Sequence, residues 1–186
     1  MARALIIVDV QKDFCPGGSL ATERGNEVAG KIGAFQQSHA RDYDAVVATQ
    51  DWHIDPGEHF SDTPDYKDSW PVHCAANTEG AAMNEHINTD TIDEFFRKGH
   101  YTAAYSGFEG TATSEDLLLA PWLKGRDVTE VDIVGIATDH CVRATTLDAL
   151  KEGFTVRVLT SMCSAVSFEA GDRALEEMHE AGAILV

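Results

Sequence analysis

Four potential metal ligands lie close together in the sequence. Three of the eight histidines of the chain lie within 23 residues together with Asp51, and these four residues are Asp51, His53, His59 and His73. Carboxylate and imidazole groups together suit a borderline divalent cation such as zinc, iron or manganese. Their spacing is not helical, so a loop must carry them. The alternative is a set of surface histidines on an exposed polar loop.

Cys141 is the best placed of the four cysteines to act as a nucleophile. It follows an apolar run over 131–137 and precedes a helix that we expect to begin near Val142. A thiol at a helix N-terminus faces unpaired N–H groups and the positive end of the helix dipole, which should lower its pKa. Cys15, Cys74 and Cys163 are expected to be free thiols buried as small apolar side chains.

A cysteine nucleophile needs a base and an electrostatic helper, and two other predicted strands end on suitable side chains. Asp9 follows five apolar residues, and Lys98 ends the strand predicted over 92–98. The carboxyl ends of parallel strands meet at one edge of a sheet, so Asp9, Lys98 and Cys141 should converge there. The alternative is a structural ion pair between Asp9 and Lys98.

The segments that must position these candidate residues are predicted to alternate between strands and helices. Six short apolar runs predict buried strands, and they span residues 3–10, 43–49, 92–98, 131–137, 155–160 and 183–186. Between them, apolar residues recur three and four apart, as at Val28, Ile32 and Phe35. This alternation predicts an α/β protein: a single domain over 1–186, doubly wound and three-layered (α/β/α), with a six-stranded, mainly parallel sheet.

Two segments depart from this alternation. Ser114, followed by Glu115 and Asp116, predicts a helix N-terminus, although Pro121 should end or kink that helix. Residues from about 50 to 91 show no sustained period and contain several prolines and aromatic residues. So long a loop inside a compact domain is usually functional, and we expect it to be the metal-binding loop.

The composition restricts the partners. Fourteen basic against 31 acidic residues give a formal net charge of −17, which disfavours binding to nucleic acid or to an anionic membrane. No apolar run approaches the roughly 18 residues of a membrane span, and the first residues do not resemble a secretory signal. We therefore expect a cytoplasmic protein with a small-molecule substrate. The choice between a monomer and a homo-oligomer stays open.

Several motifs, in order, resemble those of isochorismatase-like cysteine hydrolases. They are the segments over 4–14, 51–60, 70–74, 98–99 and 135–142, and the match extends over nearly the whole chain. Within that superfamily the similarity is closest to the nicotinamidases of actinobacterial type, which also hydrolyse pyrazinamide, through the segments over 53–57 and 104–110.

The resemblance implies a role for each matching residue. Asp9, Lys98 and Cys141 match the catalytic triad of the family, and Asp51, His53, His59 and His73 match its metal ligands. A cis peptide is implied between Ile136 and Ala137, with the backbone N–H groups of Ala137 and Cys141 forming an oxyanion hole. The implied substrate-binding residues are Phe14, Trp70, Tyr105, Ile136, Ala137 and His140.

The implied reaction is hydrolysis of nicotinamide to nicotinate and ammonia through a thioester on Cys141, in NAD salvage. The family places the ring nitrogen of the substrate on one divalent metal ion. Three alternatives stay open: another amidase of the superfamily without a metal, a hydrolase in which metal-bound water attacks the amide, and a metal-dependent binding protein on the same fold.

Overall fold

The computed structural model describes all 186 residues and contains a seven-stranded sheet. The strands are β1 (Ala2–Val8), β2 (Ala45–Asp51), β3 (Glu94–Lys98), β4 (Thr111–Ala112), β5 (Val128–Ile136), β6 (Thr155–Ser164) and β7 (Ile184–Leu185). Their order across the sheet is β4-β3-β2-β1-β5-β6-β7, and every neighbouring pair is parallel except β3 and β4. The sheet order therefore reverses between β1 and β5, where open parallel sheets bind their ligands.

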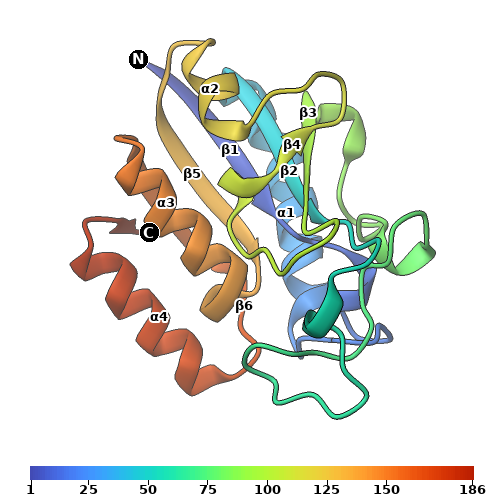
Figure 1. Ribbon diagram of the computed structural model, residues 1–186. Helices are drawn as coiled ribbons and strands as arrows, with labels where there is room; N and C mark the ends of the chain where they lie inside the picture. The colour runs from blue at the N-terminus through green and yellow to red at the C-terminus, as the bar shows by residue number, and fades with distance from the viewer.

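The four α-helices cover both faces of the sheet. They are α1 (Gly25–His39), α2 (Leu119–Lys124), α3 (Arg143–Lys151) and α4 (Phe168–Glu180). Figure 1 shows α3 and α4 side by side on one face, with α1 on the other. The predicted three-layer α/β class is confirmed, and the predicted strand count of six is wrong by one. β4 was missed because two residues are too short to show a period.

The apolar runs form strands because both faces of the sheet are covered. In β1, Ala4, Ile6 and Val8 belong to the core under α2, α3 and α4, whereas Leu5 and Ile7 belong to the core under α1. All five are fully buried. A strand buried on both faces shows no polar alternation, which is why β1 reads as a continuous apolar segment.

The helix predicted from Ser114 does not form there. The Ser114 hydroxyl donates to the carboxylate of Glu94, which holds the segment after β4 as a turn. The helix α2 begins only at Leu119, so that Pro121 lies in its first turn. The backbone nitrogens of a first turn have no partner within the helix, so proline is tolerated at this position.

The segment over 50–91 is a long, ordered loop at the carboxyl ends of the central strands (Figure 1). Gln11 anchors its start and its middle, because its Nε2 atom donates to the Asp51 carbonyl at 2.8 Å and to the Ala81 carbonyl at 2.9 Å. The backbone N–H of Cys74 donates to Asp13 Oδ2 at 2.8 Å. These hydrogen bonds fix the loop against the segment that follows β1.

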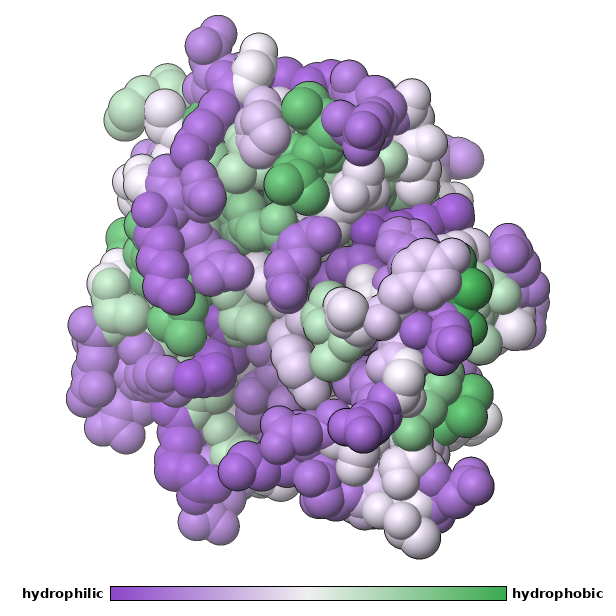
Figure 2. Space-filling view, in the orientation of Figure 1, coloured by the Kyte–Doolittle hydropathy of each residue, from purple (hydrophilic) through white to green (hydrophobic).

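The visible surface is mainly hydrophilic, and its apolar side chains gather in separate groups (Figure 2). None of the helices combines the length and the apolar character that crossing a membrane requires.

Candidate active site and metal centre

Three strands bring Asp9, Lys98 and Cys141 together. Asp9 follows β1, Lys98 is the last residue of β3, and Cys141 lies in a π-helical turn (Thr138–Val142) between β5 and α3. Lys98 Nζ lies 2.9 Å from Asp9 Oδ2 and 3.8 Å from Cys141 Sγ. All three side chains are buried. The convergence predicted from the strand ends is therefore present.

The carboxylate of Asp9 is held on both of its oxygens. The Thr49 hydroxyl donates to Oδ1 at 2.6 Å, and Lys98 donates to Oδ2 at 2.9 Å. The backbone of Asp9 has a φ of 46°, in the left-handed region that non-glycine residues seldom adopt. Such a conformation persists only where the surroundings impose it, and it is common at functional sites.

The electrostatics of this cluster keep the thiol protonated. Burial raises the pKa of Cys141 well above its usual value, Lys98 opposes the rise, and Asp9 and Asp51 add to it. The lowered thiol pKa expected from the helix N-terminus is therefore wrong, because burial, together with Asp9 and Asp51, outweighs the ammonium group of Lys98. Burial also raises the pKa of Asp9. A carboxylate with a raised pKa is a better proton acceptor for a neighbouring thiol.

Lys98 stays charged in the same cluster. Burial disfavours its ammonium form, but Asp51 and Asp9 outweigh burial and raise the pKa of Lys98 well above its usual value. The cation thus offsets part of the negative charge that forms when Cys141 loses its proton.

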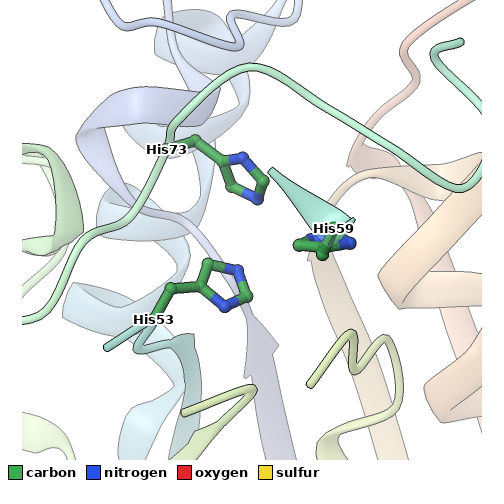
Figure 3. Close-up of side chains that lie close together, drawn as sticks. All are labelled: His53, His59 and His73. Atoms are coloured by element: carbon green, nitrogen blue, oxygen red, sulfur yellow. The ribbon is translucent and has the colours of Figure 1, made fainter. Parts of the chain in front are cut away.

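The three predicted histidine ligands converge on one space. The ring centroid of His53 lies 5.0 Å from that of His59 and 4.9 Å from that of His73, and the centroids of His59 and His73 are 5.3 Å apart. One nitrogen from each ring lies within 4.8 Å of the other two. Figure 3 shows the three rings gathered although they come from separate points of the loop.

The hydrogen bonds of these rings fit a metal ion. His53 Nδ1 donates to the Gly99 carbonyl at 2.6 Å, and His73 Nδ1 donates to the Pro71 carbonyl at 2.7 Å. Both rings therefore present the lone pair of Nε2, an arrangement typical of histidines that bind metals. His53 Nε2 and His59 Nδ1 are buried and have no hydrogen-bond partner. Buried nitrogens are seldom left unpaired, and a divalent cation would satisfy them.

Burial keeps the third histidine available as a ligand. It lowers the pKa of His59 to about 4, with a further contribution from His53 and His73, so the ring is neutral at pH 7. The small size of Gly99 leaves room for the ring of His53, since a Cβ atom at position 99 would lie 2.7 Å from His53 Cε1. Any side chain at position 99 would displace the ring of His53.

Asp51 lies between the two clusters. Its Oδ2 atom is 3.6 Å from His53 Nε2 and 3.8 Å from His73 Nε2, whereas its Oδ1 atom bonds Lys98 Nζ. Burial raises the pKa of Asp51, but Lys98 and His53 outweigh burial and lower it. The carboxylate is therefore ionised, and it can bind a metal through one oxygen while it pairs with Lys98 through the other.

A pocket opens onto both clusters. Five predicted substrate-binding residues line it, namely Phe14, Trp70, Tyr105, Ala137 and His140, together with Asp51, His59, His73 and Cys141. Trp70 Nε1 donates to the Tyr105 hydroxyl at 3.3 Å, and the Trp70 ring stands edge-on to His140 with centroids 5.1 Å apart. The predicted cis peptide between Ile136 and Ala137 is confirmed.

Comparison with known proteins agrees with this geometry. The isochorismatase domain model matches residues 3–186. The chain belongs to the isochorismatase family. A Mycobacterium tuberculosis protein named nicotinamidase/pyrazinamidase is 53% identical over 184 residues, which cover 99% of this chain and 98% of the relative. The family predicted from the motifs is thus confirmed.

Two solved structures extend the similarity. Pyrococcus horikoshii pyrazinamidase in complex with zinc has a TM-score of 0.84 and 39% identity, over 100% of this chain and 99% of that one. An L. infantum protein in complex with nicotinate has a TM-score of 0.86 and 32% identity, over 100% of this chain and 92% of that one.

The pocket of this isochorismatase-family protein differs from the sequence-based set at four positions. Ile136 is fully buried in the core under α1, and its side chain does not line the pocket. Leu20, Thr22 and Val166 do line it and were missed. Leu20 and Thr22 lie in an irregular segment with no pattern to indicate them. Val166 follows β6, which continues to Ser164 instead of ending near position 160, so the strand-end rule would have found it.

Proposed function

We propose that this protein hydrolyses nicotinamide to nicotinate and ammonia, and pyrazinamide to pyrazinoate, as a step of pyridine nucleotide salvage. The observation that carries the proposal is one pocket lined both by Cys141, which belongs to the buried Asp9–Lys98–Cys141 cluster, and by two of the three clustered histidines, His59 and His73. The relatives named above, one of them a nicotinamidase/pyrazinamidase, give this geometry its substrate.

Asp9 and Cys141 carry out the first half of the reaction. The carboxylate of Asp9 takes the proton of the Cys141 thiol as the sulfur attacks the amide carbon, which gives a tetrahedral intermediate with a negative oxygen. The backbone N–H groups of Ala137 and Cys141 are proposed to hold that oxygen, a type of contact typically worth a few kcal/mol per donor. The carbon–nitrogen bond then breaks, Asp9 returns its proton to the departing ammonia, and a thioester on Cys141 remains.

The same base serves the second half. Asp9 takes a proton from a water molecule as the water oxygen attacks the thioester carbon. The carbon–sulfur bond breaks, the sulfur recovers the proton from Asp9, and the product leaves as nicotinate after its carboxyl group gives its proton to solvent. Lys98 favours the ionised form of Asp9 before each proton transfer, because its ammonium group lies 2.9 Å from the carboxylate.

The proposed metal ligands are Asp51, His53, His59 and His73, and the ion is zinc, iron or manganese. Such an ion, when bound, supplies a Lewis acid that anchors the ring nitrogen of the substrate and withdraws electrons from the ring. Phe14, Trp70 and Tyr105 line the same pocket and would contact the faces and edge of a flat ring. The cytoplasmic location stays a prediction.

Ammonia release from a panel of small amides tests the function directly. We expect nicotinamide and pyrazinamide to be the best substrates, while aliphatic amides such as acetamide release little ammonia. Metal analysis of the purified protein should find about one ion per chain. A thioester trapped on Cys141 and identified by mass spectrometry separates this mechanism from direct attack by metal-bound water. Absence of turnover on both aromatic amides would rule out the proposal.

A further inference from the structure

Asp139 lies next to the nucleophile turn, and its carboxylate binds a different segment of the chain. The Val166 N–H donates to Asp139 Oδ1 at 2.9 Å, and the Ser167 N–H donates to Asp139 Oδ2 at 3.3 Å. The side chain of Asp139 is only 5% exposed. Both oxygens are thus used to hold the backbone that joins β6 to α4.

That joining segment forms part of the pocket. Val166 lines the pocket although the residue is 46% exposed, so it lies at the pocket edge. An exposed connection of this kind has little packing of its own and depends on specific hydrogen bonds for its position. The two bonds to Asp139 fix Val166 relative to the turn that carries Cys141.

The start of α4 is fitted to the same segment. The Ser167 hydroxyl accepts the Ala170 N–H at 3.1 Å and caps the helix. Gly171 allows close approach, because a Cβ atom there would lie 2.7 Å from the Cβ of Ala165. The segment is therefore held from one side by Asp139 and from the other by α4.

We propose that Asp139 is a positioning residue that sets substrate affinity by holding Val166 as one wall of the pocket. The inference rests on the proposed function and deepens it, since it assigns a residue that governs binding of the aromatic ring. Asp139 does not touch Asp9 or Lys98 in the structure, and its nearest charged neighbour is His140, with 4.0 Å between Asp139 Oδ2 and His140 Nε2. Its loss should therefore affect binding of the ring much more than the chemical step.

A double-mutant cycle tests the proposal. We expect Asp139→Ala to raise KM for nicotinamide about tenfold and to leave kcat within about threefold, the pattern of lost binding common to ground and transition states. Val166→Ala should raise KM by a similar factor, and the double variant should be no worse than the worse single variant, because both changes act through one wall. Asp139→Asn, which keeps one acceptor oxygen, should give an intermediate KM.

The control is Asp172→Asn, which removes a carboxylate from an exposed position of α4 and should change neither KM nor kcat. The dissociation constant of nicotinate, measured by calorimetry, should rise in parallel with KM in each pocket variant.

Three results would overturn the inference. They are a fall in kcat with KM unchanged in Asp139→Ala, effects of Asp139→Ala and Val166→Ala on KM that multiply in the double variant, or a nicotinate affinity that does not change. Should Asp139→Ala fail to fold, Asp139→Asn and Val166→Ala still decide. Absence of turnover by the unmodified protein would refute the proposed function instead, and nicotinate affinity would then test Asp139 alone.

Discussion

Lys98 Nζ bonds Asp51 Oδ1, so the catalytic cluster and the histidine cluster share one carboxylate. The same ammonium group donates to Asp9 at 2.9 Å. Because all three groups are buried, a change of charge at one of them is poorly screened by water and is felt by the other two. The two clusters cannot be fully independent, even though their residues come from different strand ends.

Cys141→Ala should abolish amide hydrolysis and leave the metal content unchanged. The thiol is the proposed nucleophile and is not part of the histidine cluster. We expect turnover to fall at least about 10³-fold, as happens when a covalent nucleophile is removed. Ammonia release and metal analysis of the purified variant measure the two effects. Cys15→Ala is the control, because it removes a buried thiol that does not line the pocket. Turnover within tenfold of the unmodified protein would exclude covalent catalysis by Cys141.

Asp9→Asn should reduce turnover about 10²- to 10⁴-fold, since an amide cannot accept the thiol proton. The fold should survive, because Lys98 keeps Asp51 as its partner. Steady-state kinetics measure the loss, and thermal unfolding checks the fold. If the variant keeps a near-normal kcat, another group must act as the base.

The strand ends could be predicted from the sequence because buried parallel strands are continuous apolar runs. The segment from Leu5 to Val8 is apolar on both faces, so the polar residue that follows it, Asp9, marks the sheet edge at once. The rule holds less strictly for the other two residues. Lys98 is itself the last residue of β3, which is only partly apolar, and Cys141 lies in the turn that follows β5.

Features that depend on contacts between distant segments could not be predicted in this way. The raised pKa of Cys141 depends on burial and on two carboxylates that come from other strands. The link between Lys98 and Asp51 joins two predicted sites across 47 positions of sequence. Serine often caps helices, yet the hydroxyl of Ser114 donates its hydrogen bond to Glu94 instead. No local pattern reveals which of two partners a side chain will choose.

The raised pKa of Cys141 makes thiol alkylation depend on pH. Burial and the two carboxylates raise this pKa, so the reactive thiolate is scarce at neutral pH, and the rate of reaction with iodoacetamide should rise steadily as the pH increases. In Asp9→Asn one negative neighbour is lost, which lowers the pKa of Cys141. The alkylation profile of this variant should therefore shift to lower pH even though amide hydrolysis falls.

Peptide mapping after limited labelling measures this shift and its selectivity. Cys141 lines the pocket, whereas Cys163 is buried outside it, and burial raises the pKa of Cys163 to about 12. We expect label on Cys141 well before Cys163. A profile for Asp9→Asn that moves to higher pH would contradict the assigned electrostatics.

Metal removal should weaken the positioning of nicotinamide more than it weakens the nucleophile. The three histidines lie on the loop over 50–91, and none of them bonds Asp9 or Cys141. Chelation or His53→Ala should therefore depress nicotinamide turnover severely, since lost positioning can cost several kcal/mol, while iodoacetamide should still label Cys141. The rate at which iodoacetamide labels Cys141 should change, because Asp51 then faces Lys98 without a cation on its other oxygen.

Benzamide lacks the ring nitrogen, so it should be a poor substrate of the metal-loaded protein and should lose proportionately less turnover on chelation. Turnover of both amides, measured by ammonia release before chelation, after it and after adding zinc back, makes the comparison. Equal rates on the two amides, with equal losses on chelation, would refute anchoring through the ring nitrogen and favour attack by metal-bound water.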